Sequence, residues 1–127
     1  MMHEFWVVAS FLLTAFVALL HCYILVLEMF LWETPFGRAV FRMSKENAAV
    51  TAVLAKNQGL YNGFLAAGLF WSLLSSDPLF QVYLKVFFLS CVLIAGFFGA
   101  ITAKKEILYY QAVPAAVALA VLYLSLL

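Results

Sequence analysis

The stretch AKNQGLYNGFLAAGL, residues 55–69, brings amides and glycines to the start of an apolar segment. Gly59 and Gly63 form a GxxxG step, which lets two helix backbones approach closely where lipid removes the hydrophobic drive for association. Side-chain amides donate and accept hydrogen bonds at once, so they can bridge helices without adding charge. The stretch therefore predicts a helix that packs tightly against another helix as it enters a membrane.

The composition of the whole chain is that of a membrane protein. Hydrophobic residues make up 68% of its 127 residues and charged residues 10%, whereas soluble domains have about 45–50% and about 25%. Apolar segments at about 5–31, 57–75, 79–103 and 107–127 each approach the roughly 20 residues that cross a hydrocarbon core. We expect an all-α integral membrane protein, a single domain over residues 1–127 with four transmembrane helices in an up-and-down bundle.

The basic residues predict the orientation of this bundle. One side of the predicted bundle carries six of the seven, and the opposite side has only Lys85, inside the start of the third segment. The six are Arg38, Arg42, Lys45, Lys56, Lys104 and Lys105. The positive-inside rule then places the loops 32–58 and 104–106 in the cytoplasm and both termini outside.

The connection between the first two segments is predicted to be helical as well. Thr34 and Pro35 are a suitable N-cap and first helical residue. Arg38 and Arg42 then share one face of a short amphipathic helix on the cytoplasmic surface. From Ser44 a further helical pattern runs without proline into the second apolar segment, so we expect one long second helix that begins in the cytoplasm.

The first segment places its polar side chains along one helix face. Ser10, Thr14, His21 and Glu28 differ by four, seven and seven positions. An acidic residue at mid-helix in lipid costs about 2.5–3.5 kcal/mol on translocon scales, so this face should meet other helices or a wet cavity. Glu28 is then either an interfacial carboxylate paired with a loop arginine or part of a polar pocket. His21 is either a hydrogen-bonded interior histidine or a proton relay.

The amides of the opening stretch provide the other wall of such a pocket. Close packing explains the glycines, but it does not require three amides and a tyrosine within six residues at the expected depth of Glu28. We therefore predict a ligand-binding pocket in the cytoplasmic half between the first two helices. Its predicted residues are His21, Glu28, Asn57, Gln58, Tyr61 and Asn62, with Arg38 and Arg42 at its mouth. The arginines either attract anionic lipid headgroups or recognise the anionic head of a ligand.

This set of residues favours a protein that binds or modifies a lipophilic or anionic amphiphilic small molecule. If the protein is an enzyme, Glu28 or His21 is the acid–base candidate. Two other classes stay open: a small proton-coupled exporter, whose glutamate usually lies nearer mid-membrane, and a structural subunit of a membrane complex. No motif predicts a metal site, a cofactor or nucleic-acid binding.

Two segments carry a family resemblance: ILVLEMFLWETPFGRAVF, residues 24–41, and LAKNQGLYNGFLAAGLFW, residues 54–71. They resemble the bacterial family of small four-helix membrane proteins catalogued as domain of unknown function 1304. This resemblance covers nearly the whole chain and implies a multi-pass protein of the bacterial cytoplasmic (inner) membrane with no settled activity. It also directs attention to Glu28, Asn57, Gln58 and Asn62.

A more distant similarity is to the membrane-associated eicosanoid and glutathione metabolism family. It implies a homo-oligomer, a trimer with sites between subunits at the cytoplasmic side. Asn57 matches an asparagine in the second helix of that family, whereas Val53 and Leu60 fall near the positions of its charged partners. The similarity therefore extends to the architecture and not to glutathione chemistry.

Overall fold

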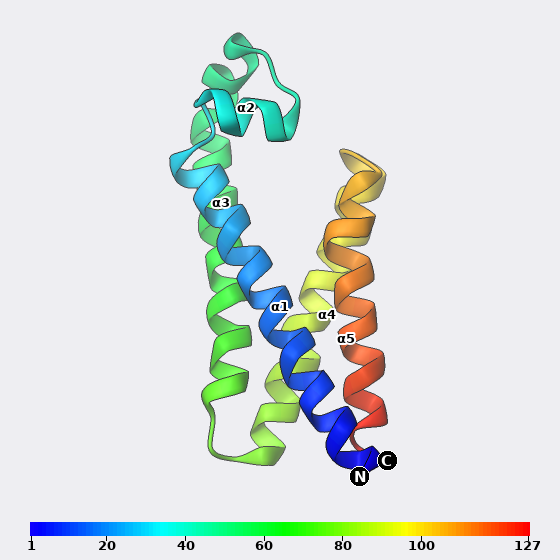
Figure 1. The fold of residues 1–127 in the computed structure, drawn as a ribbon. Coiled ribbons are helices and arrows are strands. Elements are labelled where there is room, and N and C mark those ends of the chain that lie inside the picture. The colour runs from blue at the N-terminus through cyan, green and yellow to red at the C-terminus, as the bar shows by residue number, and fades with distance from the viewer.

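The computed structural model describes residues 1–127, and the chain is helical throughout (Figure 1). Its elements are α1 (Met2–Phe30), α2 (Pro35–Phe41), α3 (Lys45–Leu74), α4 (Pro78–Thr102), the π-helical turn η1 (Leu108–Ala112) and α5 (Val113–Leu124). No strand is present. The predicted all-α fold is confirmed, and so are the short connecting helix and the long helix that follows it.

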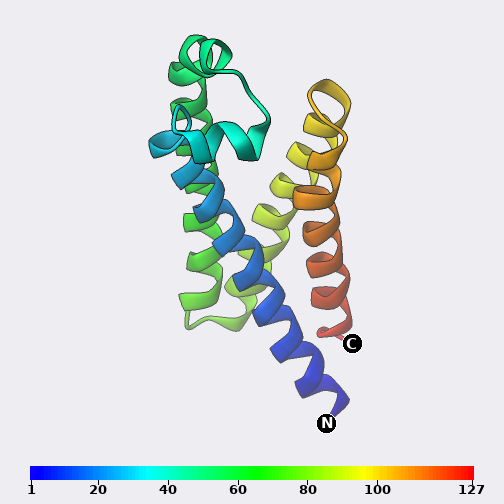
Figure 2. The ribbon, with the colours of Figure 1, turned by 45° about the horizontal axis from the view of Figure 1, so that its top comes forward.

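The long helices alternate in direction. Both termini lie at one end of the molecule, and α2 and the turn between α4 and α5 lie at the other (Figures 1 and 2). α1 packs against α3 and α5, and α4 packs against α3, η1 and α5. The four long helices share one buried core of Val17, Ala18, Leu69, Leu89, Val92, Ala115 and Ala118. This core lies in the middle of the bundle, so the end that carries α2 depends on other contacts.

Local sequence chemistry sets the ends of the helices around α2. The Thr34 side chain accepts a hydrogen bond from the Gly37 backbone N–H at 3.1 Å and so caps α2. The Ser44 hydroxyl does the same for Asn47 at the start of α3, also at 3.1 Å. Between them, Arg42 ends α2 in the left-handed region, with φ 53° and ψ 51°. These features reverse the chain from α1 through α2 into α3.

The last helix begins irregularly, where the sequence places Pro114. Proline has no backbone N–H, so the turn ahead of it loses one regular helical hydrogen bond. The chain responds with the π-helical turn η1 before α5 continues. This turn brings the backbone of Ala112 against Gly96 of α4, where an added Cβ would lie 2.5 Å from the Ala112 nitrogen. Glycine at position 96 is therefore required by the approach of these two helices.

Two helices, α1 and α4, are long and apolar enough to cross a membrane. The segment Leu108–Leu124 is a shorter apolar helix. α3 has 30 residues, but its first half carries the polar residues Lys56, Asn57 and Gln58. The prediction of membrane helices therefore agrees with the structure for α1 and α4. The other two predicted spans stay predictions.

Candidate functional site

The candidate site starts from the tight contact between α1 and α3. Gly59 is buried against α1, and an added Cβ there would lie 2.6 Å from Met29 Cγ and 3.1 Å from Glu28 Cβ. A Cβ at Gly63 would meet Leu25 of the same helix at 2.6 Å. The predicted GxxxG packing step is thus confirmed. It brings the polar residues of the two helices within reach of each other.

Glu28 is half-buried, two residues before the end of α1. The Asn62 side-chain amide donates to Glu28 Oε1 at 3.4 Å and to the Gln58 carbonyl oxygen of its own helix at 3.1 Å. Glu28 Oε2 is buried and has no hydrogen-bond partner. The structure therefore does not pair Glu28 with a loop arginine, which was one of the two alternatives from the sequence. One oxygen of the Glu28 carboxylate therefore lies buried beside α3 and is free to accept a hydrogen bond.

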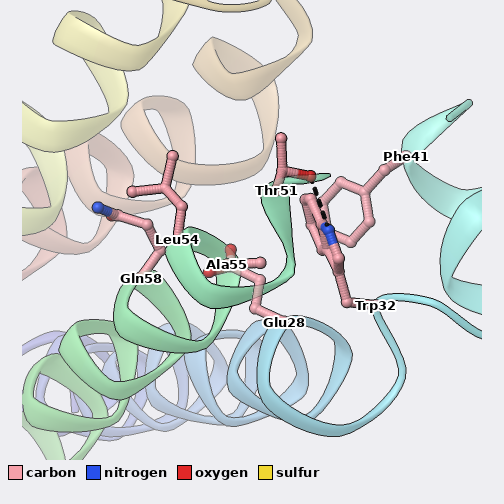
Figure 3. A pocket seen from close by; sticks show the side chains of 7 residues that line it. All are labelled: Glu28, Trp32, Phe41, Thr51, Leu54, Ala55 and Gln58. Atoms are coloured by element: carbon pink, nitrogen blue, oxygen red, sulfur yellow. Dashed lines mark hydrogen bonds between the residues drawn. The ribbon is translucent and has the colours of Figure 1, made fainter. Parts of the chain in front are cut away.

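A cavity of about 220 Å³ lies next to this carboxylate (Figure 3). It is lined by Glu28, Trp32, Phe41, Thr51, Leu54, Ala55 and Gln58. The polar groups come from the end of α1 and from one face of α3, and the last residue of α2 adds an aromatic wall. We call this the Glu28 cavity. Its lining combines a carboxylate, an amide and a hydroxyl with apolar surface, as small-molecule sites do.

Trp32 holds the side of the Glu28 cavity that faces α2. Its indole N–H donates to the Thr51 hydroxyl at 3.0 Å, and its ring packs on Phe41 with the ring centroids 4.7 Å apart (Figure 3). Thr51 in turn donates to the Asn47 carbonyl oxygen at 2.7 Å. These contacts join α1, α2 and α3 at one point. The sequence patterns did not single out Trp32, Phe41 or Thr51 as site residues, although an indole at the end of an apolar helix is itself a signal of a polar partner.

His21 lies deeper in the bundle and does not line the Glu28 cavity. Its side chain is fully buried, and Nδ1 donates to the Val17 carbonyl oxygen at 2.8 Å. Nε2 is buried without a partner. Ser10 and Thr14 on the same face of α1 are buried too, so the prediction that this polar face meets other helices is confirmed for these three residues.

The other predicted site residues lie outside the cavity lining. Asn57 is exposed, and its amide donates to the Val53 carbonyl oxygen of its own helix at 2.9 Å. Tyr61 is exposed as well. Arg38 is half-buried with Nε unpartnered, and Arg42 is exposed at the end of α2. Of the predicted set, the structure brings together Glu28, Gln58 and Asn62.

These features define an all-helical protein with two helices of membrane-crossing length and a polar cavity at one end of a tight helix pair. Residues 15–123 match the family described as "Protein of unknown function (DUF1304)", and the chain belongs to that family. The matched region contains every residue of the Glu28 cavity.

A curated relative supports the same assignment. The chain is 32% identical over 106 residues to "Uncharacterized protein YpaA" of Lactococcus lactis subsp. lactis (strain IL1403), an alignment that covers 82% of this chain and 87% of that protein. No solved structure matches the chain. The similarity to the eicosanoid and glutathione metabolism family gains no support from these comparisons.

Proposed function

We propose that this protein crosses a bacterial cytoplasmic membrane four times and binds a lipophilic small molecule in the Glu28 cavity. The distribution of side chains supports the membrane part of the proposal. Large apolar groups face outward on the long helices, among them Phe11, Phe64 and Phe87, while Ser10 and Thr14 are buried. A soluble bundle keeps its large apolar side chains inside, so this inverted pattern is the one expected of a protein surrounded by lipid.

The charge distribution supports the proposed orientation. Lys104 donates to the backbone carbonyl of Phe41 at 2.8 Å, so the turn after α4 and the end of α2 lie together. The segments 31–44 and 103–107, which contain Arg38, Arg42, Lys104 and Lys105, therefore lie at the end of the molecule opposite the termini (Figure 1). Under the positive-inside rule that end faces the cytoplasm, and the N- and C-termini lie outside.

The observation that carries the ligand proposal is the unpartnered Oε2 of Glu28 at the edge of a cavity. A buried polar atom without a partner costs about 1–3 kcal/mol, and a ligand that hydrogen-bonds to it removes that cost. The cavity volume of about 220 Å³ is below the roughly 300–1,000 Å³ of usual ligand sites. We therefore assign it to the polar end of a longer molecule, whose lipophilic remainder extends into the membrane.

The chemistry of the lining narrows the ligand further. A carboxylate with a free oxygen favours a ligand whose polar end carries a hydrogen-bond donor, such as an alcohol, amine or amide. Neither Arg38 nor Arg42 lines this cavity, so they are better suited to anionic headgroups at the membrane surface. An amphiphile with an anionic head is therefore the less favoured ligand for the Glu28 cavity.

The proton-coupled exporter is the weaker alternative. Glu28 lies two residues from the end of α1, whereas a carboxylate that alternates between two sides is expected near the middle of the helix. The buried titratable residue nearer the middle is His21, but it does not line the Glu28 cavity, and its Nδ1 bonds the Val17 carbonyl oxygen of its own helix. The geometry therefore supports binding at one side of the membrane better than transport across it.

Native mass spectrometry of the protein extracted in mild detergent tests the proposal. We expect wild type to retain a small non-protein mass, and we expect Glu28→Gln and Asn62→Ala to lose most of it. Asn57→Ala is the matched control, because Asn57 is an amide on the same helix that bonds only its own backbone in the structure. Equal retention by all three variants, or no retained mass in wild type, would rule the proposal out. Proton uptake into vesicles that depends on Glu28 would favour the exporter instead.

A further inference from the structure

A second cavity, of about 380 Å³, lies beside the α1–α3 pair. It is lined by Met29, Phe30, Trp32, Glu33, Thr34, Ala52 and Lys56. Trp32 borders both cavities, and its hydrogen bond to Thr51 holds it in place as their common wall. We call this second space the Lys56 cavity. Its volume falls in the roughly 300–1,000 Å³ range of ligand sites, and none of its charged residues belongs to the site already described.

The Lys56 cavity carries one charge of each sign on two different elements. Glu33 lies in the turn after α1, and Lys56 lies in the first half of α3, three residues before Gly59. Both residues are exposed at the mouth of the cavity. A ligand that fits such a pair has an anionic and a cationic group held a short distance apart. A phosphate next to a primary ammonium meets this description, because each ionised group then gains an opposite charge and hydrogen bonds.

The apolar surroundings of the cavity indicate that this ligand has acyl chains. Met29 and Phe30 belong to its lining, and Phe30 is 70% exposed. Val26 stands one turn deeper on the same face of α1 and is also exposed, as is Leu60, one turn beyond Lys56 on α3. An apolar surface therefore continues from the charged mouth along both helices. A free phosphoethanolamine would leave this surface unused, whereas a phospholipid would cover it.

We propose that the Lys56 cavity binds the headgroup of a phosphatidylethanolamine-type lipid, with Lys56 meeting the phosphate and Glu33 the ammonium. Trp32 follows the end of the apolar helix α1, and indoles favour the membrane interface, where lipid headgroups lie. The inference needs α1 to cross the membrane as in the proposed function. It does not need a ligand in the Glu28 cavity, so either proposal can fail without the other.

The test is a lipid titration followed by native mass spectrometry. The purified protein is titrated with phosphatidylethanolamine and, separately, with phosphatidylglycerol of the same acyl chains, which has the phosphate but no ammonium. One interaction at the membrane surface is worth about 1 kcal/mol, so we expect about fivefold tighter binding of phosphatidylethanolamine. Glu33→Gln should abolish this preference and leave phosphatidylglycerol binding unchanged. Lys56→Gln should weaken the binding of both lipids.

Lys45 and Glu46 provide a matched control pair, because both are exposed in the first turn of α3 and neither lines the cavity. We expect Lys45→Gln and Glu46→Gln to bind both lipids as wild type does. We also expect Glu28→Gln to keep the lipid preference. Equal affinity for the two lipids in wild type, or a preference that survives Glu33→Gln, would overturn the inference. Competition by soluble O-phosphoethanolamine at matched concentration would overturn the assignment to a lipid.

Discussion

Replacing Gly59 with alanine tests how closely α1 and α3 must approach to form the Glu28 cavity. The added Cβ would lie 2.6 Å from Met29 Cγ, 3.1 Å from Glu28 Cβ and 3.2 Å from the Leu25 carbonyl oxygen. The Met29 side chain can rotate away, but the other two atoms move only with the backbone of α1. Overpacking of this kind costs about 1–3 kcal/mol, and the better helix propensity of alanine offsets about 1 kcal/mol of it. We therefore expect a net loss of about 1 kcal/mol in the free energy of unfolding.

Gly63→Ala is the matched control, one turn further along the same helix. Its Cβ would approach only the tip of the Leu25 side chain, at 2.6 Å from Cδ1, which can move aside. The higher helix propensity of alanine then outweighs a small steric cost, so the free energy of unfolding should stay the same or rise by up to about 1 kcal/mol. Both variants can be unfolded in mixed micelles of rising SDS fraction, with tryptophan fluorescence as the signal. Equal stability of the two variants, or a Gly59→Ala variant more stable than wild type, would refute this packing argument.

Three further substitutions test other contacts. Lys104→Met removes the donor to the last carbonyl of α2, so amide hydrogen exchange should become faster in α2 and not in α1. Unchanged exchange would show that the contact does not hold α2. Gly96→Ala places a Cβ 2.5 Å from the Ala112 nitrogen. Because a backbone atom cannot rotate away, this substitution should cost more than Gly59→Ala, about 3 kcal/mol in the same unfolding assay. A smaller loss than for Gly59→Ala would contradict this. Trp32→Phe removes the indole donor to a threonine hydroxyl on α3 and should lower stability by about 1 kcal/mol, whereas an unchanged unfolding curve would mean that the hydrogen bond contributes nothing.

Much of the fold could be predicted because its causes are local. Thr34 followed by Pro35, and Ser44 before a proline-free helical pattern, determine where α2 and α3 begin through contacts within three residues. Pro114 favours an irregularity in the last helix for a local reason as well, since a missing N–H acts on the preceding turn whatever the tertiary structure is. The π-helical form of that irregularity was not predictable, because it also depends on the approach of α4.

The candidate site was predicted only in part, for a geometrical reason. Helical periodicity shows that Gln58 and Asn62 share one face of α3 and that Asn57 and Tyr61 share a neighbouring one. It does not show which of these faces meets α1. The structure resolves this through Gly59, which turns the Asn62 face toward Glu28 and leaves Asn57 and Tyr61 exposed.

Helical periodicity could not predict the aromatic side of the Glu28 cavity. Phe41 lines the Glu28 cavity because α2 folds back over the end of α1 and packs its ring on Trp32. Thr51 lines it because its hydroxyl accepts a hydrogen bond from the Trp32 indole. Both contacts depend on how three elements meet in space. A sequence pattern describes one element at a time, so it can predict the polar faces of α1 and α3 without predicting what closes the space between them.

A high-resolution structure of the protein in a lipid bilayer is the most direct measurement of whether Glu28 serves a ligand. We predict elongated non-protein density in the Glu28 cavity, with one atom within hydrogen-bond distance of Oε2 and the Asn62 amide still on Oε1. A cavity closed by its own side chains, or a Glu28 carboxylate paired with Arg38, would contradict the account.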